Sequence, residues 1–135
     1  MLELLLSRAV GTVYTDKCGL TTDQWRVLAA VAVWGPIEPS QVSRWATVDK
    51  ASVSRAVAAL VEKAFISRAS HTLDRRKQVL SLTPSGHRTF TLVVKSIHEI
   101  QERLFEVYGR AEQMAFFRVR DTLEERLRQM LGNGK

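Results

Sequence analysis

The sequence predicts a mainly α-helical fold with one small antiparallel β-hairpin. Over most of the 135 residues, apolar side chains recur at three- and four-residue steps, as they do along one face of a helix. The period becomes strand-like only around residues 65–82, where two short apolar runs flank a polar, charged tip. Gly19, Gly35 and Gly109 fall between the periodic segments and mark their ends.

Two helices are expected in the N-terminal third. The first covers about residues 2–17 and stops at Cys18-Gly19. The second covers residues 24–34, after Thr21-Thr22-Asp23, which offers good N-cap residues. Because the second helix is apolar nearly all round, we expect it to be buried.

A pair of shorter helices follows. A helix over residues 39–46 should place Val42 and Trp45 inward, and Asp49 is a good N-cap for a helix over residues 50–63. The apolar stripe of that last helix consists of Val53, Val57, Leu60, Val61 and Ala64. Its opposite face is small and polar, so this face is expected to meet solvent or a polar partner.

Two strands and two long helices complete the chain. Strands are expected at residues 65–69 and 78–82, and Thr83 should cap a helix over about residues 84–108. A last helix is expected over about residues 112–131. A helix pair followed by a hairpin of this length is the layout of a winged helix-turn-helix.

The net charge is +6, and its excess lies in the middle of the chain. Residues 39–88 carry nine basic and three acidic side chains, whereas the segments before and after are nearly balanced. A localised basic segment indicates a surface that binds a polyanion. The alternative is a solvated basic face without a partner.

Several classes of function are not expected. The sequence contains no Ser-His-Asp or Cys-His grouping and no glycine-rich phosphate loop, so we expect no enzyme. One cysteine and three scattered histidines form no metal-ligand pattern, so neither a metal nor a cofactor is expected. No apolar run approaches the ~20 residues that cross a bilayer, and the N-terminus lacks the pattern of a signal peptide, so we expect a cytoplasmic protein without a membrane partner.

The helix over residues 50–63 suits the major groove of double-stranded DNA. Small side chains on its outer face allow close approach, and its polar and basic side chains can reach phosphates or base edges. The DNA contacts expected from this helix and its neighbours are Ser40, Gln41, Lys50, Ala51, Ser52, Ser54, Arg55 and Arg68. A winged-helix module for protein contacts would need bulky apolar residues on this face, and the sequence places none there.

The hairpin tip supplies a second set of candidate DNA contacts, Asp74, Arg75, Arg76 and Lys77. An arginine on a protruding loop can enter the narrow minor groove. An extended chain points Arg75 and Arg76 to opposite sides, so one can insert while the other pairs with Asp74 or a phosphate. Taken alone, the tip also fits a solvated charged turn.

At these motifs the sequence resembles the MarR family of bacterial transcriptional regulators. The matching stretches are Leu20–Leu28, Asp49–Val57, Leu60–Arg68 and Asp74–Gly86. Asp74-Arg75-Arg76 followed by a strand that ends in Leu82-Thr83-Pro84-Ser85-Gly86 resembles the family's wing signature. The resemblance makes Asp74 and Arg76 the paired wing residues. The chain departs from the family at Ala64, where a glycine is usual, and in its short first helix.

The resemblance implies one domain, 1–135, with a DNA-binding lobe at 20–83 and dimerisation helices at 1–18 and 84–131. A homodimer would read a pseudo-palindromic operator in successive major grooves about 34 Å apart, and a repressor is expected. The long apolar stripes after residue 84 support a homodimer independently, because a small helical domain cannot cover them alone. The alternative is an unusually elongated monomer.

Two ways of switching such a protein follow from the same resemblance. Many members respond to small aromatic acids, and candidates for such an effector site are Tyr14, Trp25, Arg26, Trp34 and Trp45. The alternative is that these are core or surface aromatics. One branch of the family senses organic peroxides through a cysteine near the N-terminus, which makes Cys18 a redox candidate. An inert thiol is the alternative there.

Overall fold

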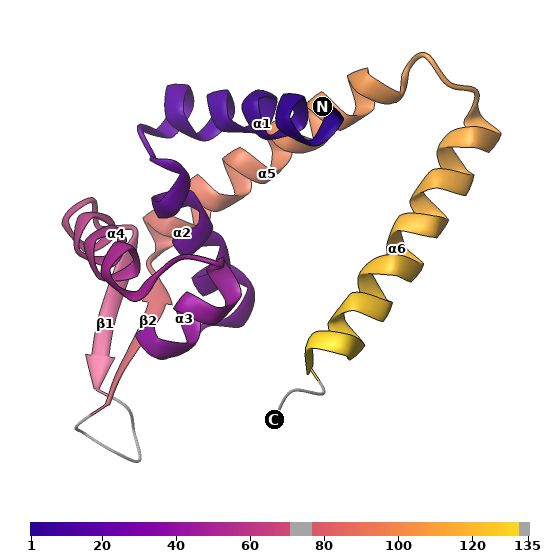
Figure 1. Cartoon of the computed structure of the whole chain (residues 1–135). Helices are drawn as coiled ribbons and strands as arrows, with labels where there is room; N and C mark the ends of the chain where they lie inside the picture. Colours follow the sequence, from indigo (N-terminus) through magenta and orange to yellow (C-terminus); the bar gives the residue numbers. More distant parts are fainter. Residues whose placement is uncertain (71–76, 133–135) are drawn as a thin grey trace. The chain divides into compact units, whose positions relative to one another are not determined.

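The computed structural model describes residues 1–70 and 77–132, which form six helices and one two-stranded sheet (Figure 1). The elements are α1 (Leu2–Cys18), α2 (Thr22–Trp34), α3 (Pro39–Ala46), α4 (Lys50–Glu62), β1 (Ile66–Ser70), β2 (Gln78–Leu82), α5 (Pro84–Phe105) and α6 (Arg110–Gly132). The predicted fold class, mainly α with a small antiparallel hairpin, is confirmed. Every predicted helix and strand is present, with ends that differ by a few residues at most.

The chain divides into two compact units, Met1–His98 and Glu99–Lys135, and their boundary falls inside α5. In the first unit the core forms around α2. Leu28 of α2 is fully buried, as are Val42 of α3, Leu60 of α4 and Leu80 of β2. The expectation that α2 is buried is therefore correct for its middle, whereas Trp34 at its end is 45% exposed.

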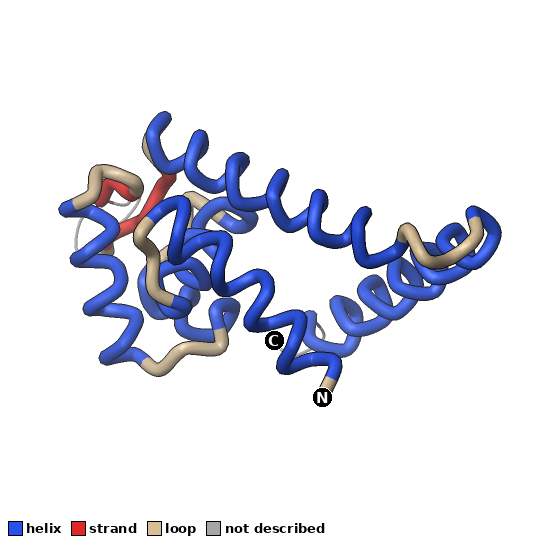
Figure 2. Tube along the Cα trace, turned by 90° about the horizontal axis from the view of Figure 1, so that it is seen from above, coloured by secondary structure: helices blue, strands red, loops and turns tan. Residues whose placement is uncertain are grey.

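The sheet pairs β1 with β2 in antiparallel register, from Ile66 opposite Leu82 to Ser70 opposite Gln78. The strands lie at one end of the first unit, beside the start of α5 (Figure 2). Ile37, just before α3, adds a further bridge, because its backbone N–H and C=O both pair with Leu80, at 3.1 and 2.8 Å. The base of the hairpin is thus tied to the start of α3.

Side chains cap the helices at the positions that the sequence predicts. Thr21 accepts a hydrogen bond from the Gln24 amide at 3.2 Å, and the Gln24 side chain accepts one from the Thr21 amide at 3.1 Å. Asp49 accepts from the Ser52 amide at 2.9 Å. These caps satisfy amides that have no partner inside the helix.

Two expectations about single residues are wrong, and the backbone at a third position is notable. Trp45 does not face inward but is 39% exposed and stacks on Trp34. Val61 belongs to the predicted apolar stripe of α4 but is 37% exposed. Ala64 has a φ of 56°, the left-handed conformation that a glycine would take, so this turn keeps the glycine-type backbone.

The second unit contains the end of α5 and all of α6. The ring of Phe105 lies 4.6 Å from that of Phe116 and 5.3 Å from that of Phe117, centroid to centroid. The Gln113 side chain donates to the carbonyls of Phe105 and Tyr108 at 2.8 and 2.9 Å. These contacts close the turn between the helices. Among the described residues, no helix is both long enough and apolar enough to span a membrane.

Candidate nucleic-acid interface

The outer face of α4 is open to solvent and small. Ala51, Ser54 and Ala58 are all exposed, while Val53 and Val57 on the neighbouring side of the helix are buried. Asp49 is the N-cap of the helix and accepts a hydrogen bond from the Ser52 amide. This hydrogen bond holds the pKa of the Asp49 carboxyl below its usual range. The helix thus presents a smooth surface that a duplex groove can approach closely.

A groove of about 360 Å³ runs beside this face. It is lined by residues of three elements, Pro39, Ser40, Lys50, Val53, Ser54, Val57 and Arg68. Four residues that the sequence predicts as DNA contacts therefore meet at one place. Ser40 comes from the start of α3, Lys50 and Ser54 from α4, and Arg68 from β1. Lys50 and Arg68 supply two cations there, and both are exposed.

Other predicted contacts are held by neighbours on their own helices. Arg55 donates to the hydroxyl of Ser52 at 2.8 Å, so its guanidinium lies along the surface of α4. The side-chain oxygen of Gln41 accepts from the Glu38 amide at 3.3 Å, which leaves its NH₂ group able to donate. Both residues are exposed to solvent.

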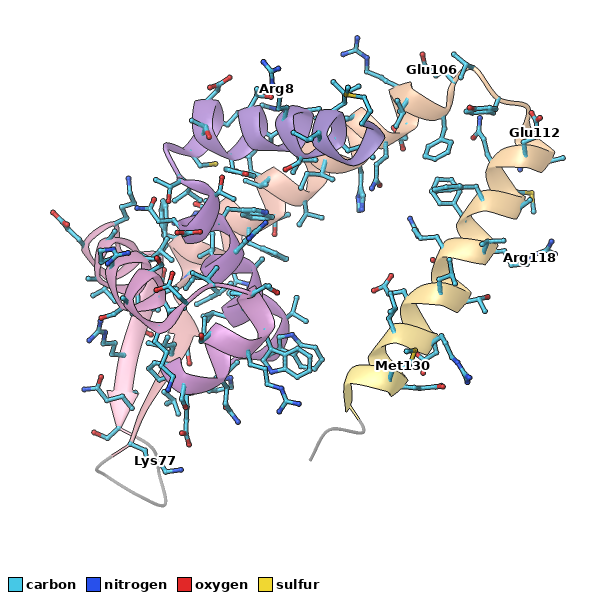
Figure 3. All side chains as sticks on the ribbon, viewed as in Figure 1. Arg8, Lys77, Glu106, Glu112, Arg118 and Met130 are labelled. Atoms are coloured by element: carbon cyan, nitrogen blue, oxygen red, sulfur yellow. The ribbon has the colours of Figure 1, made fainter. Side chains whose placement is uncertain are left out.

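At the base of the hairpin, Lys77 forms an ion pair with Glu38 at 3.0 Å. Figure 3 shows Lys77 there and Arg8 on α1, at opposite ends of the first unit. Asp74, Arg75 and Arg76 lie outside the described residues. Sequence reasoning missed Glu38. Its place before Pro39 can be seen in the sequence, but its pairing with Lys77, 39 positions later, depends on the formation of the sheet.

Comparison with known proteins identifies the middle of the chain. The MarR family model matches residues 20–77. This segment is therefore similar to proteins of the MarR family. An uncharacterised helix-turn-helix-type transcriptional regulator of Staphylococcus aureus is 25% identical over 87 residues, 64% of this chain and 60% of that protein. The chain thus spans about 60% of the length of the first curated relatives that it matches.

Solved structures share the fold of this chain. The YusO protein of Bacillus subtilis is 25% identical, with a TM-score of 0.74 over 92% of this chain and 87% of its own. A mutant of MepR from S. aureus, solved bound to an oligodeoxyribonucleotide, has a TM-score of 0.69 at 16% identity, over 100% of this chain and 94% of its own. The MarR-type winged-helix fold therefore extends beyond the segment that the family model matches.

The five aromatic and basic residues predicted for an effector do not gather in one place. Tyr14 stacks on Trp25 at 5.8 Å between ring centroids, and Trp34 stacks on Trp45 at 4.3 Å. Arg26 is exposed. Of the five, only Tyr14 lines the open cavity of about 740 Å³ along α1. A small aromatic effector of this protein stays a prediction.

Cys18 ends α1 and is half-buried. Burial raises the pKa of its thiol, although the neighbouring Lys17 lowers it. A raised pKa leaves less thiolate at neutral pH and makes the thiol less reactive. Peroxide sensing through Cys18 stays a prediction that this environment does not favour. Among the described residues, no group of three His, Cys, Asp or Glu side chains could hold a metal ion.

Proposed function

We propose that the chain is a sequence-specific regulator that binds double-stranded DNA as a homodimer on a pseudo-palindromic operator and represses transcription. The observation that carries this proposal is the groove where Lys50 and Arg68 meet beside the small outer face of α4. Cations reach the phosphates there, and the helix enters the major groove. The match to the MarR family and the DNA-bound MepR mutant support the proposal.

The homodimer is supported by the surface of α6. Most of its large apolar side chains are more than half exposed in the single chain, including Val119, Leu123, Leu127 and Met130. These side chains recur at steps of three and four residues and so share one helical face with Phe116. A second copy of the chain would cover such a face and would place two α4 helices on one duplex.

The proposal is tested by selecting bound fragments from random duplex DNA and measuring their affinity at several salt concentrations. We expect an inverted repeat to be enriched and log affinity to fall by about 0.9 per unit of log salt for each phosphate contacted. Arg68→Ala and Lys50→Ala should weaken binding, and each lost phosphate contact should reduce the slope by about 0.9.

Lys95→Ala is the matched control, because Lys95 is also exposed but lies on α5 and does not line the groove. It should leave both affinity and slope unchanged. Selection that enriches no sequence, or binding that is indifferent to salt, would contradict the proposal. If Lys95→Ala weakened binding as much as Arg68→Ala, the groove would not be part of the DNA-binding surface.

Repression is tested separately with a promoter that overlaps the selected site. Transcription from this promoter should fall when the protein is added and recover when the site is scrambled. A rise in transcription would show an activator and would leave DNA binding intact.

A further inference from the structure

Thr83 lies between β2 and α5 and forms hydrogen bonds with residues before β1 and with the first turn of α5. Its hydroxyl donates to the Ala64 carbonyl at 2.6 Å, within reach of the Phe65 carbonyl at 3.3 Å, and accepts from the Gly86 amide at 3.0 Å. Its own amide donates to the Phe65 carbonyl at 3.1 Å. One side chain therefore caps α5 and ties that cap to the turn between α4 and β1.

Gly86 brings the two segments into contact. A Cβ atom at this position would collide with the carbonyl oxygen of Phe65. Gly86 is buried in the first turn of α5. Only a residue without a side chain lets the backbone of α5 pass so close to the peptide unit of Phe65.

The same turn is bonded to the end of α4. The Ala64 amide donates to the Val61 carbonyl, and the Phe65 amide donates to the Leu60 carbonyl, both at 2.9 Å. The peptide units of Ala64 and Phe65 thus bond to α4 through their amides and to Thr83 through their carbonyls. This arrangement joins the C-terminal end of α4 to the N-terminal end of α5 without a flexible linker.

We propose that Thr83 and Gly86 are positioning residues for DNA recognition, because they fix the angle between α4 and α5. The inference rests on the proposed function, in which α4 reads the DNA, and on the dimerisation helices expected at 1–18 and 84–131, which include α5. A helix of the length of α4 is about 20 Å long, so a rotation of about 10° at its fixed end moves the other end by roughly 3 Å. That shift is about one base-pair step, so the junction would set the half-site spacing that the dimer accepts.

The test compares two DNA duplexes, the site selected by the wild-type protein and the same site with one base pair inserted between its half-sites. The readout is the affinity for the selected site divided by the affinity for the site with the inserted base pair. A uniform loss of binding does not change this ratio. We expect this ratio to be roughly 2- to 30-fold smaller for Thr83→Val than for the wild type, because the variant keeps the shape of threonine without its hydroxyl. Gly86 amide hydrogen exchange should be faster in the same variant.

Thr83→Ser restores the hydroxyl and should restore the wild-type ratio, and Thr91→Val is the matched control on an exposed part of α5. A wild-type ratio in Thr83→Val would overturn the inference and leave the proposed function standing. If Thr83→Val fails to fold, a lowered ratio in Thr83→Ser would overturn it as well, because the serine keeps the bonding oxygen. Absence of DNA binding by the wild-type protein would instead defeat the proposed function and this inference with it.

Discussion

Ala64 adopts a backbone conformation that is unfavourable for a residue with a side chain. Its φ of 56° costs an L-residue roughly 1–2 kcal/mol. The conformation is imposed from both sides, because its amide bonds to Val61 and its carbonyl accepts from Thr83. The turn therefore has a backbone that suits glycine although the residue is alanine.

Replacing Ala64 with glycine should stabilise the protein by about 0.5–1 kcal/mol. The strain is relieved, and part of that gain is offset by the larger backbone entropy of glycine in the unfolded chain. Thermal unfolding at fixed protein concentration measures the difference. The matched control is Ala58→Gly on the exposed face of α4, which should destabilise by about 1 kcal/mol because its backbone is helical. A stability loss in both variants would rule out strain at Ala64.

The first turn of α4 is stabilised by a charged N-cap residue. Asp49 caps the helix, and the hydrogen bonds that it accepts from Ser52 lower the pKa of its carboxyl. Arg55 adds a smaller effect of the same sign. A charged cap therefore stabilises α4 more than a neutral one, and it does so only while the carboxyl is ionised.

This charge effect predicts a pH dependence. A lowered pKa in the folded state adds stability above the unfolded pKa of about 3.9, and this stability is lost as pH falls through the folded value. The Tm of Asp49→Asn should therefore lie below that of the wild type between pH 5 and 7, and the gap should shrink progressively as pH falls below about 4. Asparagine keeps the capping geometry, so the comparison isolates the charge. A gap that persists unchanged to pH 2.5 would refute the role of ionisation.

The single chain leaves the apolar face of α6 exposed to solvent. Leu123 and Leu127 of α6 are 58% and 54% exposed, and none of the described side chains of that helix is buried. Burying such a leucine contributes about 1.5–3 kcal/mol, so a row of them favours association strongly. The proposed homodimer follows from this face.

Leu123→Glu should convert the dimer into a 15.3 kDa monomer at concentrations where the wild type is dimeric. Losing the leucine from both copies would cost roughly 3–6 kcal/mol, a 10²- to 10⁴-fold weaker association, before the cost of burying the charges. Sedimentation measures the mass. Met114→Glu is the matched control, because Met114 is 65% exposed on the opposite face of the same helix. Dimers in both variants, or monomers in both, would place the interface elsewhere.

Most of the fold could be predicted because its signals are local. The apolar period and the capping residues Thr21, Asp49 and Thr83 act within one or two helical turns, so the helix ends agree closely with the structure. The exposed face of α4 followed from the same period. The burial of Trp45 was predicted wrongly, because the helical period shows which residues share a face but not where the core beneath that face ends.

The elements, their order, the basic middle segment and the small outer face of α4 could all be predicted from the residues alone. The folded chain was needed to show that Ser40, Lys50, Ser54 and Arg68 line one groove, that Glu38 pairs with Lys77, and that Thr83 joins α5 to the turn after α4. The two sets of features differ in the range of the interactions behind them. Helical period and caps depend on neighbours in the chain, whereas these contacts join residues up to 39 positions apart that meet only after the sheet and core have formed.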